Sequence, residues 1–308
     1  MASLTLKQRL ACRASLLRSV REYFHRESVQ EVVTPLLRDY GSNEVHLDSL
    51  KLDQGYLQTS PEYAMKCLLA ETGQSIYQLC SAFRAGEVGS RHRVEFQMLE
   101  WYRVDYSLSE LVRDLETLIS EIVYTLAKDF TVSAVDRHFM SASYAALFRE
   151  HYDMCPHASS DDQLKALACD FAHLDAFSRR ADVLDALFAE AVEPQLTKAT
   201  IVTDFPACQA ALAETRIDEE GNEVAHRFEF YLGGMEIANA YQELTDADEL
   251  RRRFEENNKL RREMGKEEVT NDAELLSAMT TLPGCAGIAL GVDRLLMALL
   301  GETDITLT

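Results

Sequence analysis

The chain has 308 residues, 47% of them hydrophobic, so it can bury a large core as one domain or as two. Its 51 acidic and 31 basic side chains give a formal net charge of −20, which opposes a broad nucleic-acid-binding surface. The sequence has neither an apolar run of ~18 residues nor a secretory signal, and its seven cysteines include no CxxC pair, so we expect no membrane partner, no cysteine zinc site and a cytoplasmic location.

The first predicted element is an amphipathic helix from about Leu6 to Arg26, where apolar residues recur at helical spacing. A short β-rich run, VQEVVTPLL, follows, and Pro35 confines it to a sheet edge or to an end facing another chain. The stretch YLQTSPEYAMKCLLAETG predicts a strand leading into a helix, with Ser60 as N-cap and Pro61 at the first helical position. SIYQLCSAF then predicts another strand.

A further strand is predicted from about Glu95, after a loop rich in charged side chains. Because side chains alternate between two faces, Glu100 falls on an apolar face, whose other members are Phe96, Met98 and Tyr102. A carboxylate aimed at a packed interior costs about 3–5 kcal/mol when its partner is missing. Two interpretations stay open: an internal Arg or Lys pairs with it, or the missing cation belongs to a ligand.

Two helical regions are predicted next. Residues from about Ser107 to Ala127 form one, and much of 143–195 forms a mainly helical insert, because Ala, Leu and Phe recur there at helical spacing. The sequence contains no internal repeat, low-complexity tract or Pro/Gly-rich linker that would mark a domain boundary. We therefore expect one domain over residues 1–308.

The stretch HRFEFYLGGMEIANAYQELTDA predicts a β-hairpin whose two-residue turn is the Gly-Gly pair at 233–234. This turn puts Glu229 and Glu236 on one face, roughly 7–8 Å apart. Two such carboxylates suit a Mg²⁺ ion that also binds phosphate oxygens and water, although a solvated acidic sheet face explains the pattern equally well. Asn239 joins that face only if the strand bulges near Ala238.

The C-terminal stretch GCAGIALGVDRLLMALLG predicts a strand with closely approached glycines and then a helix, with Arg294 in the first helical turn. A cation there opposes the helix dipole, so a nearby anion would explain its position. The sequence has neither GxxxxGK[ST] nor GxGxxG, so phosphates would have to be held by arginines.

Together these stretches resemble the catalytic core of the class II aminoacyl-tRNA synthetases. The first helix, the strand after it and Pro35 are similar to motif 1 of that family, FRAGEVGSRHRVEF to motif 2 and GIALGVDRLLMAL to motif 3. TSPEYAMKCLL, EFQMLEWYR and MEIANAYQELTDA resemble the lysyl branch, above all its truncated paralogues that ligate β-lysine to a lysine of elongation factor P. The resemblance runs from about residue 5 to 303, so we expect no anticodon-binding domain.

The resemblance implies an α+β fold, with an antiparallel β-sheet flanked by helices and a homodimer formed through motif 1. It implies an ATP-dependent, Mg²⁺-using ligase that activates a lysine-type amino acid, expected to be (R)-β-lysine, as its adenylate and transfers it to elongation factor P. Two alternatives stay open: an enzyme that charges tRNA without an anticodon domain, which the acidic balance disfavours, and a catalytically inactive regulator.

The resemblance also implies roles for residues around ATP. Arg84, the expected catalytic residue, would hold the α-phosphate and stabilise the charge that develops when a carboxylate attacks it. Phe96 would stack on adenine, with Arg294 on the other side of the ring. The other implied ATP-binding residues are Glu87, His92 and the two implied Mg²⁺ ligands, Glu229 and Glu236.

A second set of residues is implied for the amino acid. Glu62 would meet the α-side amine of the substrate. The pocket for the terminal ammonium would be formed by Glu100, Tyr102, Asn239 and Glu243, with Tyr241 and Ala289 as further implied substrate contacts. On this hypothesis the cation that Glu100 lacks belongs to the substrate.

The sequence departs from the family pattern at two sites. At a third site its residue distinguishes the elongation factor ligases from the lysyl-tRNA synthetases. His92-Arg93-Val94-Glu95-Phe96 stands where the family usually has His-Asn-Pro-Glu-Phe, and Asn239-Ala240-Tyr241 where it usually has Asn-Gly-Phe. Ala289 stands where lysyl-tRNA synthetases have glycine and the elongation factor ligases have alanine. The extra methyl group favours the ligase branch, because a β-amino acid places its amine one carbon farther from the carboxylate.

Overall fold

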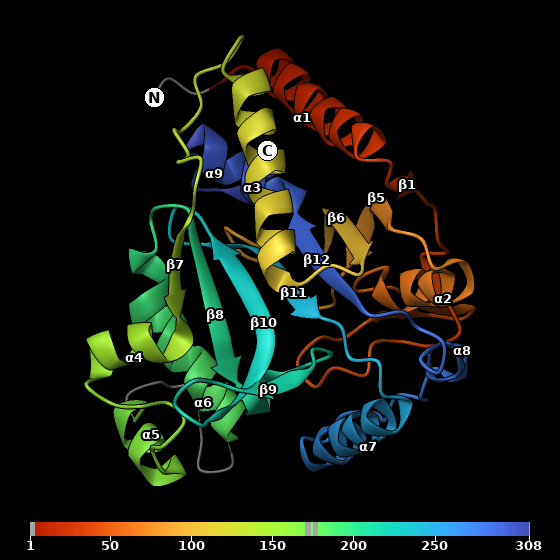
Figure 1. The fold of residues 1–308 in the computed structure, drawn as a ribbon, viewed down its shortest axis with the longest axis vertical. Coiled ribbons are helices and arrows are strands. Elements are labelled where there is room, and N and C mark those ends of the chain that lie inside the picture. The colour runs from red at the N-terminus through yellow and green to blue at the C-terminus, as the bar shows by residue number, and fades with distance from the viewer. Residues whose placement is uncertain (1–3, 170–173, 175–177, 308) are drawn as a thin grey trace. The chain divides into compact units, whose positions relative to one another are not determined.

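The computed structural model describes residues 4–169, 174 and 178–307 (Figure 1). The chain divides into two compact units, Met1–Ala134 with Glu243–Thr308, and Val135–Gln242. Each unit combines a β-sheet with helices, which confirms the predicted α+β class. None of the described helices is both long enough and apolar enough to cross a membrane.

The main sheet of the first unit has the strand order β1-β5-β6-β12, and its pairs are antiparallel except for β1 with β5. A smaller antiparallel sheet has the order β2-β4-β3. The strands of these two sheets are β1 (Gln30–Glu31), β2 (Leu37–Arg38), β3 (Leu50–Leu52), β4 (Gly55–Leu57), β5 (Ile76–Phe83), β6 (Glu95–Val104) and β12 (Cys285–Gly291). The run containing Pro35 therefore forms only a two-residue edge strand before the proline, which has no N–H to donate.

Helices cover this sheet, with α1 packed on α3 and α9 packed against β6 and β12. The helices of the unit are α1 (Leu6–Arg26), α2 (Glu62–Thr72), α3 (Leu108–Leu126), α7 (Ala247–Glu263), α8 (Ala273–Ala278), α9 (Val292–Leu300) and the short η4 (Ile305–Leu307). The predicted bounds of α1 are confirmed, and a capping box between Thr5 and Gln8 explains why this helix begins at residue 6. Ser107 caps α3 in the same way with Glu110.

The start of α2 differs from the prediction by one residue. Pro61 is the N-cap and lies outside the helix, so Ser60 is not the N-cap. The Ser60 hydroxyl still accepts the Glu62 backbone N–H at 3.0 Å, and it donates to Glu100 Oε2 at 2.6 Å. The hydroxyl therefore joins the start of α2 to the carboxylate of Glu100 in β6.

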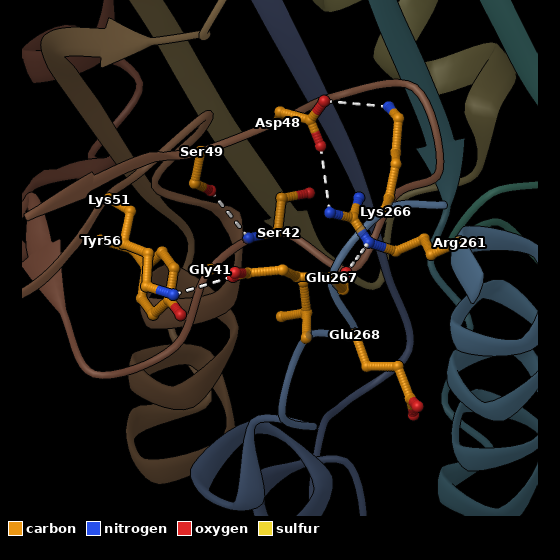
Figure 2. A pocket seen from close by; sticks show the side chains of 11 residues that line it. Gly41, Ser42, Asp48, Ser49, Lys51, Tyr56, Arg261, Lys266, Glu267 and Glu268 are labelled. Atoms are coloured by element: carbon orange, nitrogen blue, oxygen red, sulfur yellow. Dashed lines mark hydrogen bonds and ion pairs between the residues drawn. The ribbon is translucent and has the colours of Figure 1, made fainter. Parts of the chain in front are cut away.

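A cavity of about 260 Å³ lies between the loop that follows β2 and the chain that follows α7 (Figure 2). On its wall, Asp48 points toward two cations, Arg261 Nη2 at 3.0 Å and Lys266 Nζ at 2.9 Å. Burial raises the pKa of Asp48, but the hydrogen bonds and charges of Lys266 and Arg261 outweigh it and leave the pKa below its ordinary value. The Asp48 carbonyl accepts the Ala85 N–H at 2.8 Å, so this cluster fixes the chain beside Arg84.

The second unit contains a sheet with the strand order β11-β10-β8-β7, in which β9 also pairs with β10 and only β7 with β8 is parallel. Its strands are β7 (Met140–Ser143), β8 (Thr200–Pro206), β9 (Thr215–Ile217), β10 (Glu223–Tyr231) and β11 (Glu236–Gln242). Its helices are α4 (Tyr144–Tyr152), α5 (Asp161–Leu167), α6 (Arg180–Leu187), η1 (Phe188–Val192), η2 (Glu193–Gln195) and η3 (Ala207–Gln209).

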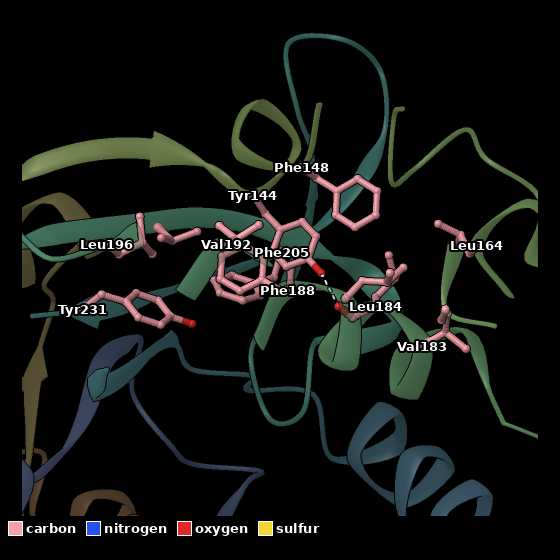
Figure 3. Packing of buried hydrophobic residues seen from close by; sticks show 14 of the residues in the cluster. Tyr144, Phe148, Leu164, Val183, Leu184, Phe188, Val192, Leu196, Phe205 and Tyr231 are labelled. Atoms are coloured by element: carbon pink, nitrogen blue, oxygen red, sulfur yellow. Dashed lines mark hydrogen bonds between the residues drawn. The ribbon is translucent and has the colours of Figure 1, made fainter. Parts of the chain in front are cut away.

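An aromatic cluster forms the core of this unit, where the helices meet the strands (Figure 3). The Tyr144 ring stacks on Phe188 with ring centroids 4.6 Å apart and lies 5.1 Å from Phe205. The Tyr144 hydroxyl donates to the Leu184 carbonyl at 3.0 Å, so its polar end is satisfied inside the core. Part of the predicted helical insert, residues 170–173 and 175–177, lies outside the described residues.

The β10–β11 hairpin follows the predicted register, with Tyr231 paired to Glu236. The glycines at 233–234 have φ values of 66° and 70°, which only glycine adopts readily in a two-residue turn. The next residue pair along the hairpin joins Phe230 to Ala238, so Ile237 is an extra residue on β11. This irregularity is the bulge near Ala238 that Asn239 needs in order to share a face with Glu229.

Candidate functional site

Glu100 lies in β6 with only 2% of its surface exposed. Its Oε2 accepts the Ser60 hydroxyl at 2.6 Å and its Oε1 accepts the Tyr102 hydroxyl at 2.7 Å. Burial and then the nearby Glu62 carboxylate raise the pKa of Glu100 to about 8, although the two hydroxyls act in the opposite direction. Both partners are neutral, so the internal cation that the sequence left open is not bound to Glu100.

An internal cation does exist, and it is Lys66 of α2, which is 1% exposed. Its Nζ lies 2.7 Å from Glu62 Oε1 and 2.6 Å from Glu243 Oε2. Burial alone lowers the pKa of Lys66, but the Glu243 and Glu62 carboxylates raise it well above its ordinary value. Lys66 is therefore a buried cation between two of the predicted substrate carboxylates, a residue that the sequence analysis missed. Its four-residue spacing from Glu62 was the available signal.

Strand β12 forms one wall of this cluster. In the β6–β12 register Ala289 is paired with Glu100 and Gly287 with Tyr102. A Cβ built on Gly287 would overlap Glu243 Oε1 and the Tyr102 ring, so only glycine lets these two side chains approach. Ala289 places a single methyl group beside Glu100. The structure thus brings together the predicted residues Glu62, Glu100, Tyr102, Glu243 and Ala289.

The loop between β5 and β6 carries the predicted phosphate-binding residues. The Arg84 guanidinium lies over the Phe96 ring, 5.1 Å from its centroid, and Arg84 Nη1 is 3.7 Å from Glu87 Oε1. The Arg84 N–H donates to the Val94 carbonyl at 2.9 Å, which closes the base of the loop. Because this bond uses the carbonyl of residue 94, it does not depend on whether that residue is valine or proline.

Arg294 occupies the first turn of α9, as predicted, and contacts the same loop. Its Nη2 lies 2.6 Å from His92 Nε2, and its Nε donates to the Arg91 carbonyl at 3.3 Å. The neighbouring Asp293 accepts the Gln97 N–H at 2.7 Å, which ties the start of α9 to β6. The structure therefore joins His92 to Arg294 and Arg84 to Phe96.

The second unit holds the predicted metal carboxylates on one face of its sheet. Glu229 accepts hydrogen bonds from the Arg227 guanidinium and the Tyr231 hydroxyl. Burial raises the pKa of Glu229 to about 8; Arg227 lowers it and the Glu236 carboxylate raises it again. Arg227 is a further residue that the sequence analysis missed, although its two-residue spacing from Glu229 puts both on one strand face.

Asn239 lies directly opposite Glu229 because of the β11 bulge, and its Nδ2 donates to the Tyr241 hydroxyl at 3.2 Å. The Arg227 guanidinium lies over the Tyr241 ring, 5.4 Å from its centroid. Tyrosine at the position where the family usually has phenylalanine thus gives Asn239 a polar partner.

Across the described part of the chain, no group of three or more His, Cys, Asp or Glu side chains is arranged to hold a metal ion. The donor set on this face is a pair of carboxylates, and one of them already contacts Arg227. Such a pair suits Mg²⁺ that takes its remaining ligands from phosphate and water, and it does not suit an all-protein site.

The similarity of this chain to known proteins covers the residues of both units. A family model described as class II tRNA synthetases (D, K and N) matches residues 1–308. The elongation factor P–(R)-β-lysine ligase of Mannheimia succiniciproducens is 38% identical over 310 residues, which cover 96% of this chain and 92% of that protein. The ligase of the same name from Pasteurella multocida is 38% identical, covering 97% and 93%, and that from Klebsiella pneumoniae is 37% identical, covering 95% and 91%.

We predict that Gly287→Ala destabilises the protein, because the new Cβ overlaps Glu243 and the Tyr102 ring. Overpacking of this kind costs about 1–3 kcal/mol, measurable as a lower midpoint of urea unfolding. Gly284→Ala is the matched control, since a Cβ there meets nothing within 4 Å. Equal midpoints for the two variants would contradict the close packing at Gly287.

Proposed function

Because this chain belongs to the class II tRNA synthetase family, we propose that it is an ATP-dependent ligase that attaches a lysine-type amino acid, (R)-β-lysine, to elongation factor P. The observation that carries the proposal is the charge of the buried cluster. Two carboxylates, Glu62 and Glu243, contact one ammonium, Lys66, and a third carboxyl, Glu100, accepts hydrogen bonds from two hydroxyls. When all are ionised, two negative charges remain, and an amino acid with two ammonium groups compensates both.

The proposed reaction has two steps. In the first, the carboxylate of the amino acid attacks the α-phosphorus of ATP, the bond to pyrophosphate breaks, and the aminoacyl adenylate forms. In the second, a lysine amine of elongation factor P attacks the carbonyl carbon, AMP leaves, and the amine loses a proton. Arg84 stabilises the charge that grows on the α-phosphate in the first step, and positioning provides much of the remaining acceleration.

The remaining ATP contacts are part of the same proposal. Phe96 and Arg294 hold the adenine, while His92 and Glu87 act near the phosphates. In the structure the Arg84 guanidinium lies over the Phe96 ring, so the residue proposed for the phosphate and the residue proposed for adenine are neighbours. Glu229 and Glu236 are the residues that would hold Mg²⁺, which would neutralise phosphate charge during the first step.

The proposal further includes a single catalytic domain, a homodimer formed through α1 and β1, and a cytoplasmic location. Asn239 and Tyr241 complete the contacts proposed for the amino acid. tRNA is not a proposed partner, since the net charge of −20 opposes a broad phosphate-binding surface. The two competing hypotheses are an enzyme that charges tRNA and a catalytically inactive regulator. The test below distinguishes both from the proposed ligase.

The test is amino-acid-dependent ATP–pyrophosphate exchange with β-lysine, lysine, ornithine and norleucine, followed by AMP release with elongation factor P or tRNA. We expect exchange only with the diamino acids, because norleucine leaves a buried carboxylate without a cation at a cost of about 3–5 kcal/mol. We expect elongation factor P, and not tRNA, to accept the product. Exchange with norleucine at the rate of the lysines, or transfer to tRNA alone, would refute the proposal.

Arg84→Ala should raise the barrier of adenylate formation by about 3–4 kcal/mol, as loss of one preorganised donor does at other developing anions. The measurement is single-turnover formation of the adenylate at saturating ATP. Arg91→Ala is the comparison variant, since it removes a cation from the same loop at a residue with no proposed role. Adenylate formation at the wild-type rate by Arg84→Ala would remove Arg84 from the mechanism.

Mg²⁺ should bind tightly only together with nucleotide, because two carboxylates alone form a weak magnesium site. Calorimetric titration of Mg²⁺ with and without a non-hydrolysable ATP analogue measures the difference. Glu236→Gln should weaken the nucleotide-dependent binding. Tight Mg²⁺ binding to the nucleotide-free protein would contradict this assignment.

A further inference from the structure

We propose that Arg13 is a positioning residue for the nucleotide site, because it clamps the junction between β6 and α9 and so fixes the spacing between Phe96 and Arg294. This inference rests on the proposed function, in which these two residues hold the adenine from opposite sides. Arg13 lies in α1, outside the residues proposed to contact a substrate, and acts through the two segments that it joins.

The carboxylate of Asp293 connects β6 to the start of α9. The residue is 4% exposed, and its Oδ2 accepts the Gln97 N–H at 2.7 Å. Phe96 directly precedes Gln97 in β6. Arg294 directly follows Asp293 in α9. This hydrogen bond therefore links the two segments at a point one residue away from each proposed adenine contact.

Arg13 holds both partners of that hydrogen bond. Its Nη1 lies 2.5 Å from Asp293 Oδ1, and its Nη2 donates to Gln97 Oε1 at 2.9 Å. A guanidinium presents its donors in a rigid planar fork, so it holds two acceptors at a set separation, which the point charge of a lysine does not do. Both carboxylate oxygens of Asp293 are thus hydrogen-bonded, and the charge of this buried group is paired.

Arg13 and Phe96 lie on opposite faces of β6. Neighbouring side chains of a strand alternate between its two faces, so Phe96 points away from Gln97, whose side-chain amide contacts Arg13. The Phe96 ring lies instead below the Arg84 guanidinium, 5.1 Å from it. An adenine stacked on Phe96 is therefore separated from Arg13 by the strand, and an effect of Arg13 on nucleotide binding must pass through β6 and α9.

Removal of Arg13 would leave the Asp293 carboxylate buried without its cation. Because an unpaired buried charge is strongly unfavourable, we expect the carboxylate to turn toward solvent and release the Gln97 N–H. The first turn of α9 would then no longer be held to β6 by this bond, and Phe96 and Arg294 would lose their fixed spacing. A ring held between a cation and an aromatic side chain needs both at a set separation, so adenine binding should weaken.

Arg13→Met should raise the KM for ATP about 10-fold in lysine-dependent ATP–pyrophosphate exchange, the size expected when one cation–π contact is lost. The KM values for lysine and for pyrophosphate should stay within about 2-fold of the wild type, with little change in kcat, because neither ligand contains adenine. Calorimetric titration of the full-length protein with Mg²⁺ and a non-hydrolysable ATP analogue should show the same loss of affinity. Arg13→Lys keeps the charge beside Asp293 but not the fork, so its KM for ATP should lie between those of the wild type and Arg13→Met.

Arg9→Met is the matched control. Arg9 lies one turn earlier in α1, and its Nη2 is 2.8 Å from Oε1 of Glu302, beyond the C-terminal end of α9. A general effect on α1, or on a dimer formed through it, would change both variants alike, whereas loss of the junction with β6 affects Arg13→Met alone. Urea unfolding measures how far each variant is destabilised. Arg13→Gln, which keeps a neutral donor for Asp293, replaces Arg13→Met if the apolar variant does not fold.

An unchanged KM for ATP in Arg13→Met, or an equal rise in Arg9→Met, would overturn the inference. Failure of the proposed function has a different signature, because the wild-type protein would then show no amino-acid-dependent exchange. The calorimetric comparison would in that case decide the inference by itself, since it needs only nucleotide binding. A wild-type protein that binds no ATP analogue would refute both the proposed function and the role of Arg13.

Discussion

The ion pairs of Lys66 with Glu62 and Glu243 are the interaction on which the candidate amino-acid pocket depends. Removing either partner from a buried pair leaves a charge whose desolvation costs about 3–5 kcal/mol. This cost constrains several elements at once: α2 must place Glu62 and Lys66 one turn apart on the buried side, and β12 must carry glycine where Glu243 and Tyr102 approach. Residues of α2 and β12, which are distant in the sequence, are thus constrained by the same buried ion pairs.

Each unit contains one buried glutamate with a raised pKa, but the hydrogen-bond partners of the two glutamates differ. Glu100 in one unit and Glu229 in the other are both buried, and burial raises the pKa of each to about 8. Glu229 has an internal cation, Arg227, whereas the partners of Glu100 are hydroxyls. A buried carboxyl without a cation lowers the stability of the empty protein at pH values above its pKa, which is the expected cost of a pocket shaped for a charged ligand.

Much of the fold followed from periodicity and capping. The bounds of α1, the strands β5 and β6, and the β10–β11 hairpin with its turn were predictable because apolar spacing, cap residues and the Gly-Gly turn are local signals. Lys66 was not, since a lysine in an amphipathic helix normally points to solvent, and its burial depends on Glu243, which is distant in sequence. The start of α2 was misplaced by one residue, although the Ser60 hydroxyl still accepts the Glu62 N–H.

The choice between glycine and alanine along β12 gives the pocket its shape. Gly287 and Ala289 are two residues apart, so both point to the face that carries Tyr102 and Glu100. At 287 no Cβ fits, because Glu243 and Tyr102 fill the space, whereas at 289 one methyl group is accommodated beside Glu100. Residue 289 therefore adds one methyl group to the wall of the cluster beside Glu100, whereas residue 287 must add none.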